Sequence, residues 1–407
     1  MIGLKHGFLR LFGQIALLGA MLASPLFLSA QSSDPPEAGA SPSSSAPEVK
    51  PWWGITTDGY LSFSYNYNTN NPESRLNQFR VFDFNDDEPQ LDVAQLVFQR
   101  PISAPKQFGF RINLLAGSGV PEITAAYGLF RDTHTGVAHH FDIPEAYLSY
   151  ILPVGKGLRL DGGKFATYMG YEVIGGYDGY NDNFSRSFLF GYGVPFTQMG
   201  VKASYSFNTR ISTILSLTNG CDAVQDLNGK ATVGGQLAVA TSNNTNLTVN
   251  FLHGPERPHN GHDQRSVYEV TGTWKIAPRF TLGSDALYGH EDHAAINGGD
   301  ATWKGVAGYS KYNFTKQFSL SFRGEVFADI GGSRTGLSQT LWESTLTPEY
   351  HLHAELSRVS AKFKPVDGQF VVRGEFRRDS SNHASFSKYT GFTSRQFTTA
   401  VNLIYLF

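Results

Sequence analysis

The stretch Arg395-Gln-Phe-Thr-Thr-Ala-Val-Asn-Leu-Ile-Tyr-Leu-Phe407 decides the fold. Side chains of an extended strand alternate between two faces, so one face carries every second residue from Phe397 to Phe407. That face is apolar and rich in aromatic residues. Membrane-spanning strands show this pattern because lipid accepts the apolar face and interfacial aromatics anchor its ends. From this segment alone, the edge of a secreted β-sandwich is the alternative.

The first thirty residues are typical of a secretory signal peptide. A basic start that includes Lys5 and Arg10 precedes an apolar core over 11–22, and Ala30 ends a plausible cleavage site. Residues 31–52, rich in Pro and Ser, indicate a flexible periplasmic leader. Beyond residue 30 no run approaches the roughly 20 apolar residues of a membrane helix, so any span must consist of strands.

Composition excludes several classes of protein. The whole chain has 33 Lys+Arg and 35 Asp+Glu, and removing the two cations of residues 1–30 leaves a net charge of about −4. This balance does not favour nucleic acid as a partner. A hydrophobic content of 41% and a mean hydropathy of −0.24 fit a barrel in which only alternate residues meet lipid. The single cysteine, Cys221, excludes an intramolecular disulfide framework, and no motif implies a cofactor.

Alternating segments of about ten residues recur from Trp53 to the end of the chain, which predicts a barrel domain over 53–407. The predicted strands are 55–67, 90–101, 107–117, 141–152, 157–167, 197–207, 210–218, 232–241, 245–253, 266–276, 279–289, 303–313, 317–329, 355–365, 368–379 and 395–407. Short turns alternate with long polar loops, which are 68–89, 118–140, 168–196, 219–231, 254–265, 290–302, 330–354 and 380–394.

This alternation predicts an all-β transmembrane antiparallel up-and-down β-barrel of about 16 strands, with short periplasmic turns, long outer loops and both termini in the periplasm. A soluble sandwich has no reason to segregate its loops by length. Totals of 14 or 18 strands are the alternatives. They remain because Leu341-Trp342 and 350–353, inside the predicted loop 330–354, could form an extra hairpin or a folded loop.

Several blocks resemble the OmpL-like family of β-barrel porins. They are Gly59–Tyr67, Pro144–Tyr150, Gly162–Phe165, Gly170–Glu172, Asn183–Ser187, Gly200–Tyr205 and Arg373–Asp379, and the similarity covers most of 54–407. The resemblance implies a barrel with a pore in the outer membrane of a Gram-negative-type bacterium, in contact with outer-membrane lipids. Strand 395–407 also resembles the C-terminal signal by which the barrel-assembly machinery recognises such proteins. The family offers no catalytic or binding residue to carry over, and Cys221 departs from the larger aromatic expected there.

With the apolar face assigned to lipid, the other face predicts the residues that line the pore. Those that we expect there are Arg111, Lys202, Glu269, Lys275, Arg323, Glu325, Arg373 and Glu375. A barrel of about sixteen strands is too wide for its wall side chains to fill, so charges of both signs would set the field that a solute crosses. The alternative is that Arg323/Glu325 and Arg373/Glu375 only form ion pairs that stiffen the wall.

The third long loop, 168–196, is the candidate constriction. It carries Glu172, Asp178, Asp182 and Arg186 among tyrosines and glycines. By analogy with general porins, whose third outer loop folds inward, we expect this loop to enter the pore with its acids facing Arg or Lys. A plain surface loop is the alternative.

These features predict a porin-like channel for passive diffusion of small hydrophilic solutes or ions, and no enzyme. The first alternative is a plugged barrel that acts as a receptor or adhesin. A less favoured one is an outer-leaflet hydrolase, for which His290, Asp292 and Asp285 are the nearest candidates without a Gly-x-Ser-x-Gly motif. A homotrimer is possible, and the sequence leaves the oligomeric state and the solute open.

Two pairs of histidines have spacings that could hold a metal ion, His259/His262 and His290/His293. Both pairs fall in predicted outer loops, and the sequence offers neither a third fixed ligand. We therefore expect these histidines to be solvated and predict no metal site.

Overall fold

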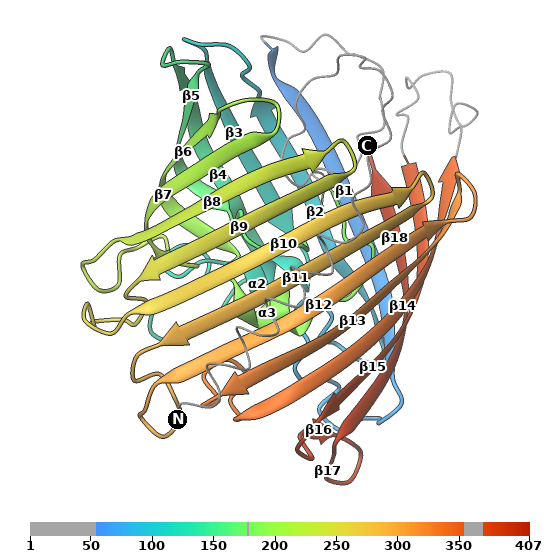
Figure 1. Cartoon of the computed structure of the whole chain (residues 1–407). Coiled ribbons are helices and arrows are strands. Elements are labelled where there is room, and N and C mark those ends of the chain that lie inside the picture. The colour runs from blue at the N-terminus through green and yellow to red at the C-terminus, as the bar shows by residue number, and fades with distance from the viewer. Residues whose placement is uncertain (1–53, 177–178, 354–368) are drawn as a thin grey trace. The chain divides into compact units, whose positions relative to one another are not determined.

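The computed structural model describes residues 54–176, 179–353 and 369–407, which form a barrel (Figure 1). The predicted signal peptide, the leader and Asp178 lie outside these residues. In the described ranges no helix is both long and apolar enough to cross a membrane.

Sixteen strands form the barrel wall, and each pairs antiparallel with its neighbours in the chain. They are β1 (Thr56–Asn68), β2 (Glu88–Arg100), β3 (Phe108–Ala116), β4 (Phe141–Leu152), β5 (Leu158–Ala166), β6 (Thr197–Ser206), β7 (Ile211–Cys221), β8 (Thr232–Ser242), β9 (Thr245–Gly254), β10 (Arg265–Ala277), β11 (Phe280–Glu291), β12 (Ala301–Asn313), β13 (Phe318–Ile330), β14 (Gln339–His353), β15 (Gln369–Ser381) and β18 (Arg395–Leu406). β1 pairs with β18 from Tyr60↔Leu406 to Asn68↔Thr398, which closes the wall. The predicted up-and-down barrel is confirmed.

The links between strands carry the few remaining elements. They are the helices α2 (Val120–Thr124) and α3 (Phe188–Gly193) and a small hairpin of β16 (Phe386–Ser387) and β17 (Phe392–Thr393). We call the end of the barrel with the links 69–87, 117–140 and 167–196 the long-loop end, and the opposite end the short-turn end.

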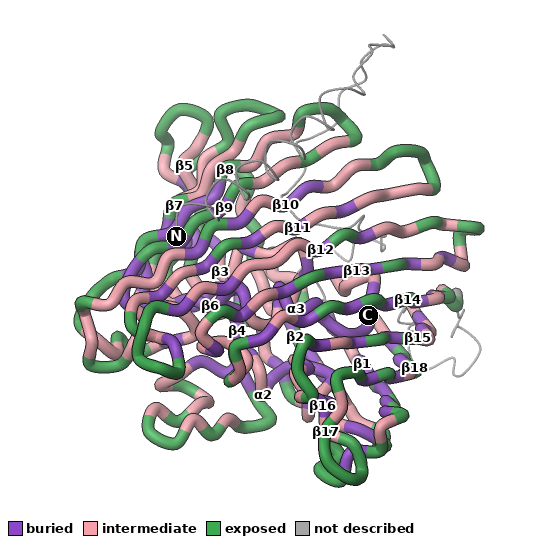
Figure 2. The backbone as a smooth tube through the Cα atoms, turned by 60° about the horizontal axis from the view of Figure 1, so that its bottom comes forward, coloured by how far each residue is buried: buried purple, intermediate pink, exposed green. Residues whose placement is uncertain are grey.

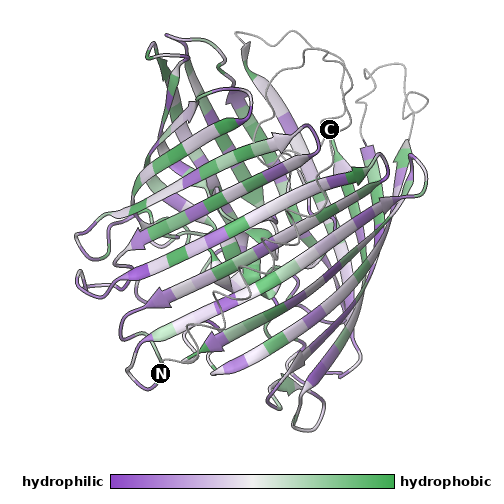
Figure 3. Cartoon of the chain, in the orientation of Figure 1, coloured by the Kyte–Doolittle hydropathy of each residue, from purple (hydrophilic) through white to green (hydrophobic). Residues whose placement is uncertain are grey.

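Strand β18 has the two faces that its sequence predicts. Phe397, Val401 and Leu403 are 40%, 52% and 49% exposed on the outer surface, whereas Gln396, Thr398 and Asn402 are buried inside. The same alternation of buried and exposed residues runs along strands such as β13 and β15 (Figure 2), and polar and apolar residues also alternate along the wall (Figure 3). Alternate apolar side chains therefore form the surface available to lipid.

The predicted long loop 330–354 is wrong, because β14 occupies most of it. Leu341, Glu343 and Glu349 are buried inside, and Trp342 and Leu352 are exposed outside, so the segment has the alternation of a wall strand. Pro348 obscures this pattern because proline cannot donate to a ladder and argues against a central strand. The link between β13 and β14 is only 331–338, and the predicted strand 355–365 lies outside the described residues.

The inward face is not uniformly polar, which corrects the simple division of the strands into a lipid face and a wet face. Near the long-loop end, six consecutive strands turn apolar side chains inward and bury them: Leu252, Val267, Leu287, Trp303, Phe327 and Leu341. We call these six residues the apolar band. On β10, β11, β13 and β14 the next inward residue is an acid, namely Glu269, Asp285, Glu325 and Glu343.

Candidate functional site

Segment 167–196 links β5 to β6 and contacts the inner wall of β10 to β15. Its helix α3 begins after Ser187, whose side chain accepts a hydrogen bond from Phe190 N (3.0 Å). Glu325 of β13 accepts from Phe188 N (2.6 Å) and Leu189 N (3.0 Å). The wall carboxylate thus binds the first free N–H groups of the helix, where negative charge is stabilising.

Three further wall carboxylates bind the backbone of this segment. Glu375 of β15 accepts from Phe184 N (2.6 Å) and Ser185 N (3.0 Å). Glu269 accepts from Gly170 N (2.8 Å), and Asp285 accepts from Tyr171 N (3.2 Å). Four carboxylates that point inward therefore satisfy six backbone N–H groups of one segment.

Arg323 lies at the centre of this contact and is fully buried. Its guanidinium donates to Glu172 of the segment (2.7 Å) and to Glu343 of β14 (2.9 Å). It also donates to the carbonyl of Ser185 (2.7 Å). Burial of ions is tolerated when all their partners are present, as they are here.

Other cations of the wall bind carbonyl and carboxylate oxygens of the same segment. Arg373 donates to the Asn181 carbonyl (2.5 Å), and Arg377 donates to the Arg186 carbonyl (2.5 Å). Lys311 of β12 pairs with Asp182 (2.8 Å). Asp182 thus faces a cation of the wall.

Apolar packing adds to these polar contacts. Phe188, Leu189 and Phe190 of α3 are buried in one cluster with the apolar band. Trp303 of that band also donates from Nε1 to the Gly193 carbonyl (3.2 Å). Helix, band and carboxylates form one interface between the segment and the wall.

The part of the segment next to β1 and β2 consists of 173–176 and 179–181, which we call the tip. Val173 N donates to Asn181 Oδ1 (2.8 Å), and Asn181 Nδ2 donates back to the Val173 carbonyl (2.6 Å). Arg186 supports the tip by donating to the Val173 carbonyl (3.3 Å). Burial lowers the pKa of the Arg186 guanidinium, and the charge of Glu172 acts in the opposite direction.

A cavity of about 20 Å³ lies between the tip and the wall, room for about one water molecule. Its lining includes Arg186, Arg373, Tyr60 and Asp92. Sequence reasoning missed Asp92, which accepts hydrogen bonds from Ser62 (2.9 Å) and Ser64 (2.7 Å). Alternation along β2 follows Val93, Gln95 and Val97 inward and would place Asp92 outward. Asp92 is buried as well because the pairing of β1 with β2 shifts register at Ser62/Phe63, a bulge that the sequence does not reveal.

The remaining predicted pore residues lie on other parts of the wall. Arg111 pairs with Glu145 (2.7 Å), and Lys202 lies 3.7 Å from Asp161. Lys275 is exposed near the short-turn end of β10. The suggested ion pairs Arg323/Glu325 and Arg373/Glu375 do not form. Arg323 pairs with Glu172 and Glu343 instead. Glu325 and Glu375 bind backbone N–H groups of the segment.

The three residues considered for hydrolysis do not meet. His290 Nε2 lies 3.2 Å from Asp292 Oδ1 at the long-loop end. Asp285 is fully buried on the inward face of β11, whereas alternation along β11 places His290 on the outward face. These three residues therefore do not form the hydrogen-bonded series of nucleophile, base and orienting group that such an enzyme needs.

The family model described as "Putative beta-barrel porin-2, OmpL-like" matches residues 54–407. The chain belongs to this family. As an OmpL-like β-barrel porin, it shares its fold with outer-membrane channels, and the family indicates the outer membrane as its location. A comparison with curated proteins found no match.

Solved structures similar to this OmpL-like porin are outer-membrane proteins. The anion-selective porin from Comamonas acidovorans has 9% identity and a TM-score of 0.57, over 87% of this chain and 99% of that one. The outer membrane channel DcaP of Acinetobacter baumannii has 10% identity and a TM-score of 0.54, over 87% and 97%. The trimer form of OmpT of Vibrio cholerae has 10% identity and a TM-score of 0.52, over 87% and 99%. At these identities the likeness concerns the fold.

Proposed function

We propose that this OmpL-like porin is a channel for passive diffusion of small hydrophilic solutes or ions, narrowed by segment 167–196. The observation that carries the proposal is the binding of six backbone N–H groups of the segment by four carboxylates that face inward. A wall of sixteen strands leaves space that its own side chains do not fill. The segment occupies part of that space and narrows it.

The charges around the small cavity support weak ion selectivity. The lining of the small cavity includes the carboxylates of Asp83 and Asp92 and the guanidinium groups of Arg186 and Arg373. Charges of both signs at a narrow point favour neither cations nor anions strongly. We therefore propose small polar solutes without strict charge preference as the substrates, and no enzymatic reaction.

Conductance of the refolded full chain in planar bilayers tests this proposal. We expect steps of uniform size with a small reversal potential in asymmetric salt. Replacing 174–180 by two glycines removes the tip and keeps the partners Val173 and Asn181, so the step size should increase. The matched control replaces 256–262 of the link between β9 and β10, which should leave the step size unchanged.

A plugged barrel that serves as a receptor is the second candidate function. The buried helix α3 and the small size of the cavity favour it. This alternative predicts silence over many insertions of the wild-type protein. It also predicts that the tip variant stays silent, since α3 would still fill the long-loop end. Silence of both proteins would refute the channel.

Two partner proposals follow from the same fold. Strand β18 presents Phe397, Val401 and Leu403 outward, and we propose that the barrel-assembly machinery recognises this strand. We further propose a homotrimer, the state in which one OmpT structure was solved. Mass measurement of detergent complexes tests the trimer, and a monomer in several detergents would contradict it.

A further inference from the structure

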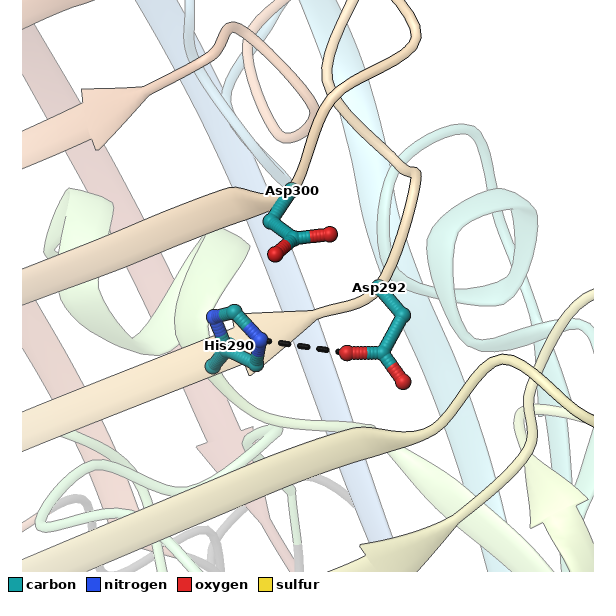
Figure 4. Close-up of side chains that lie close together, drawn as sticks. All are labelled: His290, Asp292 and Asp300. Carbon is teal, nitrogen blue, oxygen red and sulfur yellow. Dashed lines mark hydrogen bonds and ion pairs between the residues drawn. The ribbon is translucent and has the colours of Figure 1, made fainter.

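His290, Asp292 and Asp300 gather at the long-loop end (Figure 4). His290 lies near the end of β11, Asp292 follows that strand, and Asp300 precedes β12. One ligand atom from each residue lies within 4.8 Å of the other two. The link 292–300 between the two strands thus supplies the third ligand that the sequence did not reveal.

The spacing of these atoms suits a small cation. His290 Nε2 and Asp292 Oδ1 are 3.2 Å apart. Two neighbouring ligands of a tetrahedral zinc ion, each about 2.0–2.2 Å from the metal, are separated by roughly 3.4 Å. The first two ligands therefore already have the separation of a bound pair, and a small movement of Asp300 completes the set.

Each ligand is oriented by a second contact. His290 Nδ1 lies 3.4 Å from Thr302 Oγ1, so Nε2 is directed toward Asp292. Asp292 Oδ2 accepts from Gln264 N (2.9 Å), and Asp300 Oδ1 accepts from His293 N (3.1 Å). Metal sites in proteins use such outer contacts to fix the ring and the carboxylates.

The local charge also favours a divalent cation. The neighbouring acids already have cations, since Glu291 pairs with Arg265 (2.9 Å) and Asp263 pairs with Arg257 (2.8 Å). Within the described ranges, neither Asp292 nor Asp300 forms an ion pair with an arginine or a lysine. With a neutral imidazole, the cluster carries two negative charges that a divalent ion would balance.

We propose that His290, Asp292 and Asp300 bind one divalent first-row transition metal ion of the Zn²⁺ class. The imidazole selects such ions over Mg²⁺ and Ca²⁺, which prefer oxygen ligands throughout. Asp300 is exposed and His290 and Asp292 are partly exposed, which leaves positions for water ligands. The ion joins the end of β11 to the start of β12, so it holds the link 292–300 in place.

Calorimetric titration of the refolded full chain with ZnCl₂ tests this site. We expect one ion per chain, with affinity lowered at least tenfold in His290→Ala and in Asp300→Asn. His262→Ala removes an imidazole from the neighbouring link and should bind as wild type. His293→Ala should also bind as wild type, because only the backbone of His293 contacts Asp300.

Three outcomes would overturn the proposal. One is unchanged affinity in His290→Ala, and another is an equal loss in His262→Ala, which would indicate scattered surface binding. The third is displacement of Zn²⁺ by equimolar Mg²⁺, which would indicate an acidic surface without imidazole coordination. Heat-dependent mobility in SDS gels shows whether each variant has folded. The proposal does not depend on the channel, since the test measures binding alone.

Discussion

The two sides of the barrel interior use their charges differently. On β3 to β6 the charged residues pair between adjacent strands, as in Arg111–Glu145 (2.7 Å) and Lys164–Asp142 (3.0 Å). On β10 to β15 the acids Glu325 and Glu375 bind backbone N–H groups of segment 167–196. We call these two regions the paired wall and the anchoring wall.

The difference teaches that the segment is a structural part of the anchoring wall. Buried polar groups need hydrogen-bond partners. Here the buried carboxylates of the wall and the buried backbone N–H groups of the segment bind one another. Charges on the paired wall are balanced within the sheet and do not hold the segment. Charges on the anchoring wall should therefore control where the segment lies, whereas those on the paired wall should affect mainly the field in the pore.

The largest effect is expected from Arg323→Ala on the anchoring wall. This change leaves Glu172 and Glu343 buried without their shared cation, which typically costs about 3–5 kcal/mol of unfolding free energy. Urea unfolding of protein refolded into vesicles measures the loss. Lys202→Ala is the control on the paired wall, because its ion pair is longer at 3.7 Å. Equal losses in the two variants would remove the distinction between the walls.

A smaller effect is expected from Glu325→Ala. Phe188 N and Leu189 N lose their acceptor, and a buried unsatisfied group costs about 1–3 kcal/mol. The helix should shift from the wall, so the conductance step should increase as stability falls. Glu325→Gln keeps one acceptor oxygen and should lie between wild type and the alanine variant. If all three proteins gave the same step, Glu325 would not position the segment.

The smallest effect is expected from Arg111→Gln on the paired wall. The variant loses a positive charge but keeps groups that hydrogen-bond, so the step size should stay the same. The reversal potential in asymmetric salt should shift toward cation preference, because the wall becomes more negative. A changed step size with an unchanged reversal potential would show that the paired wall also positions the segment.

Periodicity explains why the wall could be predicted from sequence. A slip of one residue would turn the whole apolar set of a strand inward, so alternation fixes the faces of strands such as β18. Strand β14 was not predicted because Pro348 interrupts its otherwise regular alternation. Alternation also cannot say what an inward residue touches. Glu325 looked like a pore residue but binds α3 through contacts across 137 residues of sequence.

At the candidate sites, too, the sequence does not show which residues touch one another. The sequence indicated segment 167–196 by its length, its acids and its place among the loops. It did not indicate Glu343 as a partner of Arg323, since this depends on the register of β13 and β14. Asp300 was missed as a neighbour of His290 because the turn between them is set by backbone geometry and not by ligand spacing.

The seam between β1 and β18 has a consequence for folding. Phe407 exchanges backbone hydrogen bonds with Gly59. The Asn68 side chain donates a hydrogen bond to the Gln396 side chain, which lies 328 positions away in the sequence. Joining such distant positions has a high entropic cost until the intervening strands are in place. Ring closure should therefore be a late step, and hydrogen exchange during refolding should protect the amides of this seam after those of the β10–β13 hairpins.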